Sequence, residues 1–383
     1  MSKRALILGL LGLAGLAAWR YRIAQVGSFM IVAGLRRLVI PDPAPDFKAL
    51  APEWSTLEPT RTYPASHSRG MITYHPWYDH FQPAIANRCL AETAELGAGH
   101  IRIDVRWKDL MPDGRNVDEA AWNWYRHYLL AARNWYGLEP LIVLSNAPAP
   151  VLRYPVEARL AAWTRFVDAL AQRAGHLCTT YQVLNEPNNP VFRIFPTQTT
   201  PLAIVEAAKV IRKRVPDAQI TINILAGILG WQATLENLLR ASGSAIDIVG
   251  LDYYPGTWTV SSNSDAANWN QFVDFIAKNE ATSGSPLYRR PLAILETGYA
   301  TNVQYWRGEE QQVRYLRTLG DAMKQLDARV GPSGLRLVGI HELSDADSDA
   351  ILDPEAHFGL LTSKILRRKP GFDAARQLFH ALR

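Results

Sequence analysis

The sequence has few cysteines and no long run of charge of one sign. Cys89 and Cys178 are the two cysteines in 383 residues, which excludes a disulfide framework and a zinc site built from cysteine. We expect both to be buried free thiols. The first predicted strand, at 71–74, is followed by no Gly-rich phosphate loop, so the commonest signature of a nucleotide-binding doubly wound fold is missing.

The charge balance gives little support to nucleic-acid binding. The net charge is +5, but the basic residues are dispersed apart from short clusters at 36–37 and 367–369. A nucleic-acid footprint needs a concentrated basic patch. With 48% hydrophobic and 20% charged residues, most of the chain is expected to fold as a globular unit.

The first 40 residues have the pattern of a membrane signal. A basic start is followed by an apolar run at 5–19 and then by Arg20 and Arg22. The stretch before Arg20 is a poor cleavage site, which favours an uncleaved anchor over a cleaved signal. The run is shorter than the ~20 residues of a spanning helix, although the two arginines could snorkel and the apolar stretch at 23–35 could extend it.

Two further parts follow the predicted anchor. Residues 41–69 are rich in proline and lack periodicity, which predicts a semi-rigid linker. From residue 70 to 383 a short apolar strand, a loop and an amphipathic helix recur. The predicted strands are 71–74, 100–105, 140–144, 180–184, 219–225, 246–251, 292–295 and 337–340. The predicted helices include 84–96, 119–135, 158–174, 201–214, 266–279, 309–326 and 373–382.

Eight strand-then-helix units favour a closed (β/α)8 TIM barrel, with an open doubly wound sheet as the alternative. Glu186 follows the fourth strand and Glu296 the seventh. Because the C-terminal ends of barrel strands converge on one face, the two carboxylates are expected to face each other across its mouth. Such a pair can split a glycosidic bond if one protonates the departing oxygen and the other attacks the anomeric carbon.

Asn185-Glu186-Pro187 together with Glu296-Thr297-Gly298 resembles the clan of retaining (β/α)8 glycoside hydrolases that includes the cellulase, β-xylosidase and endo-galactanase families. The resemblance covers about residues 70–383. It implies that Glu186 is the acid/base, that Glu296 is the nucleophile and that Asn185 bonds the sugar 2-hydroxyl in the minus-one subsite. Two carboxylates suffice for this chemistry, so no metal or organic cofactor is implied.

Two further strands carry the resemblance. The stretch 99–104 with Trp107 is similar to the second strand of the clan, which implies that Arg102 holds the nucleophile ionised. The stretch 250–255 is similar to the sixth strand, which implies that Tyr254 bonds the nucleophile. Asp252 stands where many relatives have histidine, a departure that leaves the hydrogen bonding of this strand open.

Other candidates for substrate contact lie after predicted strands. The segments 341–345, 357–361 and 369–372 resemble the end of bacterial members of the clan, but Glu342 or Leu343 stands where a tryptophan is common. We expect a polar contact from Glu342. Sugar hydroxyls could also meet His75 and Asn146, and sugar rings could stack on Trp107, Trp258 and Trp306, with core packing as the alternative for each.

These patterns predict a retaining glycoside hydrolase that is endo-acting on a β-linked cell-envelope polysaccharide or exopolysaccharide. We expect a monomer in the inner membrane of a bacterium, with the catalytic domain facing the periplasm, or a secreted protein if the signal is cleaved. No nucleic-acid partner is expected. A transglycosylase on the same glycans and a non-catalytic carbohydrate-binding scaffold are the alternatives. The sugar and its linkage stay open.

Overall fold

The structure is a computed structural model that describes residues 45–59, 61–257, 265–301, 308–330, 334–346, 354–363 and 365–383. Its strands are β1 (Gly70–Tyr74), β2 (His100–Arg106), β3 (Glu139–Ser145), β4 (Thr180–Val183), β5 (Gln219–Leu225), β6 (Ile248–Asp252), β7 (Leu292–Glu296) and β8 (Leu335–Ile340). All pair in parallel and in sequence order, and β8 pairs with β1 to close the barrel. The predicted barrel is therefore confirmed.

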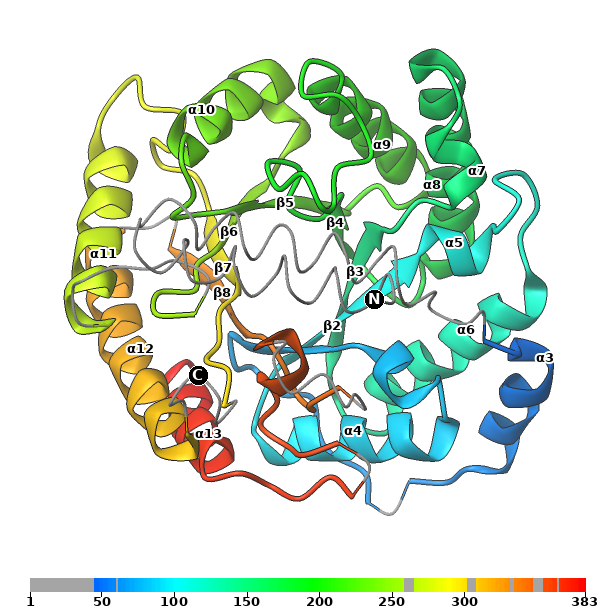
Figure 1. Ribbon diagram of the computed structural model, residues 1–383, viewed down its shortest axis with the longest axis horizontal. Helices are drawn as coiled ribbons and strands as arrows, with labels where there is room; N and C mark the ends of the chain where they lie inside the picture. The colour runs from blue at the N-terminus through cyan, green and yellow to red at the C-terminus, as the bar shows by residue number, and fades with distance from the viewer. Residues whose placement is uncertain are drawn as a thin grey trace, which may run out of the picture.

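Helices surround the strands (Figure 1). The α-helices are α3 (Phe47–Leu50), α4 (Pro83–Glu95), α5 (Trp107–Leu110), α6 (Glu119–Asn134), α7 (Ala149–Leu152), α8 (Val156–Ala174), α9 (Thr200–Arg214), α10 (Trp231–Ser242), α11 (Asp265–Ala281), α12 (Glu309–Arg329) and α13 (Gly371–Ala381). The short 3-10 helices are η1 (Ala51–Thr56), η2 (Pro76–Asp79), η3 (Gly243–Ala245) and η6 (Pro354–His357). Each long helix buries an apolar face against the strands, as amphipathic periodicity predicts.

The predicted strands and helices are all present, with ends that move by a few residues. The fourth strand ends at Val183, one residue earlier than predicted, because Leu184 has a left-handed backbone with φ 67°. Helix α10 was not among the predicted helices. Its buried Leu235, Leu238 and Leu239 nevertheless have helical spacing.

The inside of the barrel is divided into two levels. One is an apolar cluster of Met71, Leu141, Val143, Ile248, Ala293, Leu295 and Leu337. Side chains alternate along a strand, so the next inward-facing residue after Met71 is Thr73. On β6 the next inward-facing residues after Ile248 are Gly250 and then Asp252. At Gly250 a Cβ would clash with the side chain of Leu295, so the packed interior requires glycine there. Polar groups thus gather towards the C-terminal ends of the strands.

Part of the segment predicted as a linker lies against the barrel. Phe47 on α3 and Trp54 on η1 are 5% and 2% exposed. Their rings meet Trp124 of α6 at centroid distances of 6.5 and 5.7 Å, and Phe47 also meets Phe81 edge-on at 4.9 Å. Burial of such large rings stabilises the fold, so the folded unit begins before Gly70.

The predicted anchor at 1–40 lies outside the described residues. Among the residues that the structure describes, no helix is both long and apolar enough to cross a bilayer. Cys89 and Cys178 are buried and free, which confirms the prediction made for them.

Candidate active site

Glu186 and Glu296 meet at the C-terminal mouth of the barrel. Glu296 is the last residue of β7, and Glu186 lies in the turn after β4 with a left-handed φ of 39°. One carboxylate oxygen of each lies within 4.8 Å of the other, and the side chains are only 4% and 6% exposed. Asn188 holds the turn to β5 through hydrogen bonds of 2.9 and 3.0 Å with the Leu225 backbone.

Glu296 is held by the two residues that the resemblance implied. The Arg102 guanidinium from β2 pairs with Oε1 of Glu296 at 2.6 Å, and the Tyr254 hydroxyl donates to Oε2 at 2.6 Å. Nδ1 of His341 lies 3.7 Å from the same Oε2. In Glu296-Thr297-Gly298 the glycine is required, because a Cβ there would clash with the His341 carbonyl. A paired and hydrogen-bonded carboxylate suits a nucleophile.

Glu186 has a different environment. Burial, followed by the negative charge of Glu296, raises the pKa of Glu186 to about 8. Nδ2 of Asn189 donates to Oε2 of Glu186 at 2.7 Å, and this hydrogen bond lowers the pKa of Glu186. Two neighbouring carboxyl groups with such different surroundings can act as an acid and a nucleophile at neutral pH.

Asn185 is fixed by three donors to its side-chain oxygen. Arg102 Nη2 and Gln182 Nε2 each donate at 3.1 Å, and Asn223 Nδ2 donates at 2.7 Å. With its oxygen held in this way, the amide Nδ2 of Asn185 is left to face a ligand, and the described residues form no hydrogen bond with it. Asn223 also accepts the Glu186 backbone N–H at 2.8 Å, so one β5 side chain fixes both residues.

His75 and Glu342 form a second polar cluster at the mouth. His75 Nδ1 and Glu342 Oε2 are 2.8 Å apart, and His75 Nε2 is 3.5 Å from Asp104 Oδ2. Burial opposes protonation of His75, but the hydrogen bonds that its ring donates to Asp104 and Glu342 leave its pKa raised. An imidazolium between two carboxylates explains this arrangement. Asn146 joins the cluster, because it donates to Ser145 at 3.0 Å and Ser145 donates to Asp104 at 2.5 Å.

His341 lies between this cluster and Glu296. Burial opposes its charged form, but the carboxylates of Glu342 and Glu355 raise the pKa of His341 to about 10. Within the described residues, Nδ1 of His341 and Oε1 of Glu342 are buried without a hydrogen-bond partner.

Two groups of side chains have the spacing of metal ligands. They are His75 with His341 and Glu342, and Glu186 with Asp252 and Glu296. In the first group both nitrogens of His75 face carboxylates, which suits an imidazolium rather than a neutral metal ligand. In the second, the Arg102 guanidinium already pairs with Glu296. Ion pairing and hydrogen bonding therefore account for the positions of His75 in the first group and Glu296 in the second.

Trp107 requires a correction, because it does not lie where a sugar could stack. Its side chain is 0% exposed, and its ring stacks on Phe166 of α8 at 5.2 Å and meets Trp163 at 5.6 Å. The first turn of α5 directs the ring into the layer between strands and helices, where it is part of the core. Trp258 and Trp306 lie outside the described residues.

Sequence reasoning did not single out Asn223, Gln182, Asn189 and His341. A signal for two of them was available, since Gln182 and Asn223 are polar residues within otherwise apolar strands. Both are 0% exposed, and a buried amide needs partners. Inward-facing polar residues near the ends of barrel strands are therefore candidates for site residues.

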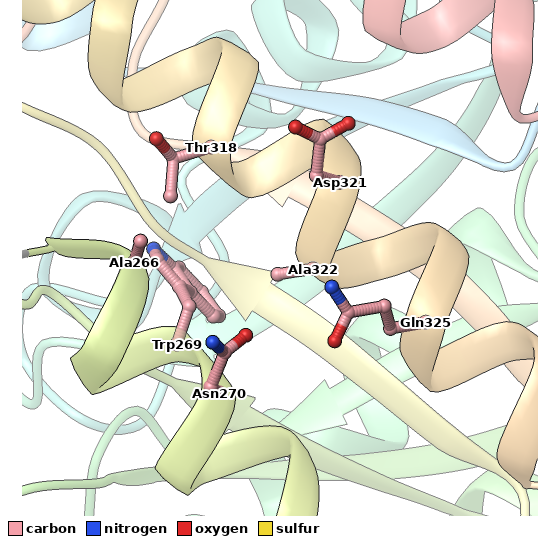
Figure 2. Close-up of a pocket in the computed structure, with 7 residues that line it drawn as sticks. All are labelled: Ala266, Trp269, Asn270, Thr318, Asp321, Ala322 and Gln325. Carbon is pink, nitrogen blue, oxygen red and sulfur yellow. The ribbon is translucent and has the colours of Figure 1, made fainter.

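A separate pocket of about 180 Å³ lies in the outer ring between α11 and α12 (Figure 2). Asn270 lines it on one helix, and Asp321 and Gln325 line it on the other. The described carboxylate pair belongs to the barrel mouth, so the chemistry is not expected at this pocket.

Comparisons with known proteins agree with the fold. No family model and no curated protein sequence matches the chain. A GH5_18 structure from Streptomyces cattleya in complex with GlcNAc has a TM-score of 0.67 at 17% identity, over 82% of this chain and 80% of that one. The exo-β-1,4-mannosidase Op5Man5 from Opitutaceae bacterium strain TAV5 has a TM-score of 0.64 at 13% identity, over 85% and 62%. A β-glucosidase from Thermotoga maritima has a TM-score of 0.61 at 15% identity, over 79% and 87%.

Proposed function

We propose that the chain is a retaining glycoside hydrolase, with Glu186 as the acid/base and Glu296 as the nucleophile. The observation that carries this proposal is the distance between the two carboxyl groups. Retaining enzymes place them about 5 to 5.5 Å apart, whereas inverting enzymes leave about 6.5 to 9.5 Å for a water molecule. Carboxylate oxygens within 4.8 Å of each other support the retaining arrangement.

The reaction proceeds in two displacements. The Glu296 carboxylate, held by Arg102 and Tyr254, attacks the anomeric carbon while Glu186 gives its proton to the departing oxygen. Glu186 is then the base that takes a proton from water, and the water oxygen displaces Glu296 from the sugar. Both protonation states of Glu186 are within reach near neutral pH because its pKa is raised to about 8.

The substrate is a β-linked glycan. Two of the structural neighbours are a β-glucosidase and an exo-β-1,4-mannosidase, which supports a β-linked hexose in the minus-one subsite. The neighbour in complex with GlcNAc adds an amino sugar to the candidates. In our proposal Asn185, Asn146 and Glu342 bind its hydroxyls. His75, which was expected to contact a hydroxyl directly, instead holds Glu342 because both of its ring nitrogens face carboxylates. We propose endo-cleavage of a cell-envelope polysaccharide or exopolysaccharide, by a monomer that the N-terminal 40 residues attach to the inner membrane on its periplasmic side.

A substrate screen tests the proposal. The full chain is incubated with aryl β-glucosides, β-mannosides and N-acetyl-β-glucosaminides, and with envelope polysaccharide and exopolysaccharide preparations, beside Glu186→Gln and Glu296→Gln. We expect cleavage of at least one substrate by the wild type and a large loss in both variants. Product length separates endo- from exo-cleavage. Activity that survives Glu296→Gln unchanged would contradict the proposal.

A further inference from the structure

A third carboxyl group, that of Asp252, lies beside the two proposed catalytic ones. Asp252 is the last residue of β6, and its side chain is 0% exposed. One of its oxygens lies within 4.8 Å of an oxygen of Glu186 and of Glu296. The double-displacement reaction requires only two carboxyl groups, so the third needs its own explanation.

The surroundings of Asp252 contain little positive charge. Asn223 on β5 donates to Oδ2 at 2.5 Å, and in the described part of the chain Oδ1 has no hydrogen-bond partner. Arg102 on β2 is the cation that acts on Asp252, but its short contact goes to Glu296 at 2.6 Å, and its Nε donates to Gln182 at 2.9 Å. Asp252 thus shares the Arg102 guanidinium with Glu296, whereas Glu186 has the amide of Asn189.

Electrostatics then decide the charge of Asp252. Burial, followed by the negative charges of Glu296 and Glu186, raises the pKa of Asp252 well above its usual range. The charge of Arg102 and the hydrogen bond from Asn223 lower the pKa of Asp252. Carboxyl groups that crowd one site cannot all ionise, so Asp252 keeps a proton when Glu296 is ionised.

We propose that Asp252 is a positioning residue that stays a neutral carboxylic acid and donates a hydrogen bond to the Glu186 carboxylate formed during the reaction. This inference rests on the proposed function. The groups that face Asp252 are Glu186 after β4, Glu296 on β7, Arg102 on β2 and Asn223 on β5. Tyr254 lies two residues after the end of β6, and Nδ1 of His341 lies 3.7 Å from the Glu296 carboxylate.

The charge of the three carboxyl groups then stays constant through the first step. A Glu296 oxygen forms a bond to the anomeric carbon, the bond to the leaving oxygen breaks, and the proton of Glu186 moves to that oxygen. Glu296 loses its negative charge in the new ester as Glu186 gains one. Asp252 transfers no proton, and its O–H stabilises the new Glu186 carboxylate. In the second step Glu186 recovers a proton from water and Glu296 is released as a carboxylate.

The experiment compares Asp252→Asn, which keeps a neutral donor of the same shape, with Asp252→Leu, which removes it. Asp321→Asn, at an exposed position on α12, is the matched control. Infrared difference spectra of the full chain at pH 6 measure the carbonyl stretch of protonated carboxylic acids. We expect Asp252→Asn to lose one such band and Asp321→Asn to lose none.

Kinetics with a dinitrophenyl glycoside, whose leaving group needs no proton, measure the step in which Glu186 is the base. A hydrogen bond to a charged group is worth about 1.5–3 kcal/mol, so Asp252→Leu should lower kcat about tenfold or more. Asp252→Asn should keep kcat within about threefold and, with a substrate whose leaving group needs a proton, leave the high-pH limb of the kcat/KM profile in place. If Asp252→Leu does not fold, Asp252→Ala takes its place.

Three outcomes overturn the inference. Infrared bands of protonated carboxylic acids that are all unchanged in Asp252→Asn show that Asp252 is ionised. A high-pH limb that moves down by about a unit in Asp252→Asn shows that a negative charge has been lost. Equal rates in Asp252→Asn and Asp252→Leu exclude a donor. These results require an active wild type. If the wild type cleaves no glycoside, the proposed function fails, and the role of Asp252 fails with it.

Discussion

A carboxylate oxygen of Glu186 and one of Glu296 lie within 4.8 Å of each other, although the residues follow different strands of the barrel. Their partners differ in kind. Glu296 has a guanidinium and a phenol hydroxyl, whereas Glu186 has the amide of Asn189. We base the proposed roles of Glu186 as acid/base and Glu296 as nucleophile on this asymmetry.

Replacement of Glu186 should separate two classes of substrate. We expect Glu186→Gln to lower kcat/KM about 10²–10⁴-fold for a poor leaving group, which needs a proton, and much less for a dinitrophenyl leaving group. Azide should restore the rate of Glu186→Ala with the activated substrate and give a glycosyl azide. Glu236→Gln, at an exposed residue of α10 that pairs with Arg240, is the control and should keep the wild-type rate. An equal loss for both substrates would argue against an acid role.

The activity should fall at high pH because the acid must be protonated. With the pKa of Glu186 raised to about 8, kcat/KM for a poor leaving group should decline above about pH 8. The Asn189 hydrogen bond lowers that pKa, so Asn189→Ala should move the decline to higher pH. A decline that stays in place in Asn189→Ala, or that moves down, would show that another group controls this limb.

Loss of the Arg102 guanidinium should affect both activity and stability. Arg102→Met leaves the buried Glu296 carboxylate without its cation and is expected to cost about 3–5 kcal/mol in the free energy of unfolding. The rate should fall about 10²–10³-fold. Arg329→Met breaks an exposed pair with Asp274 and should cost less than about 1 kcal/mol. Urea unfolding and initial rates measure the two effects. Similar unfolding costs for both variants would contradict the buried pairing.

The segment before Gly70 should contribute to stability. Trp54 is 2% exposed and packs on α6, so Trp54→Ala is expected to lower the free energy of unfolding by about 3–5 kcal/mol. Leu202→Ala, at a position 48% exposed, should change it by about 0.5 kcal/mol or less. A Trp54→Ala effect as small as that of Leu202→Ala would mean that residues 45–59 do not belong to the folded unit.

Much of the fold could be predicted from the sequence, because strand and helix periodicities alternate from residue 70 to the C-terminus. The order of the strands in a closed barrel then brings Glu186 and Glu296 to one mouth. Arg102 and Tyr254 were expected as partners of Glu296 only through the resemblance to the glycoside hydrolase clan, and both contact it.

Other features depend on the direction in which a side chain points, which the periodicity of the sequence does not determine. Trp107 follows β2 as a sugar platform would, but the first turn of α5 directs its ring onto Phe166. The three contacts of Asn223, with Asn185, Asp252 and the Glu186 backbone, exist only after the strands have closed around it. Phe47 and Trp54 lie in a Pro-rich stretch, and its composition gives no indication that their two rings are buried.

The most direct test of the central claim is to trap the glycosyl-enzyme intermediate. The full chain is treated with dinitrophenyl 2-deoxy-2-fluoro-β-glycosides of the sugars cleaved in the substrate screen, and peptide mass spectrometry locates the label. The account predicts one sugar per chain, attached to Glu296, and no label in Glu296→Gln. A label on another residue, or hydrolysis with inverted stereochemistry and no label, would contradict it.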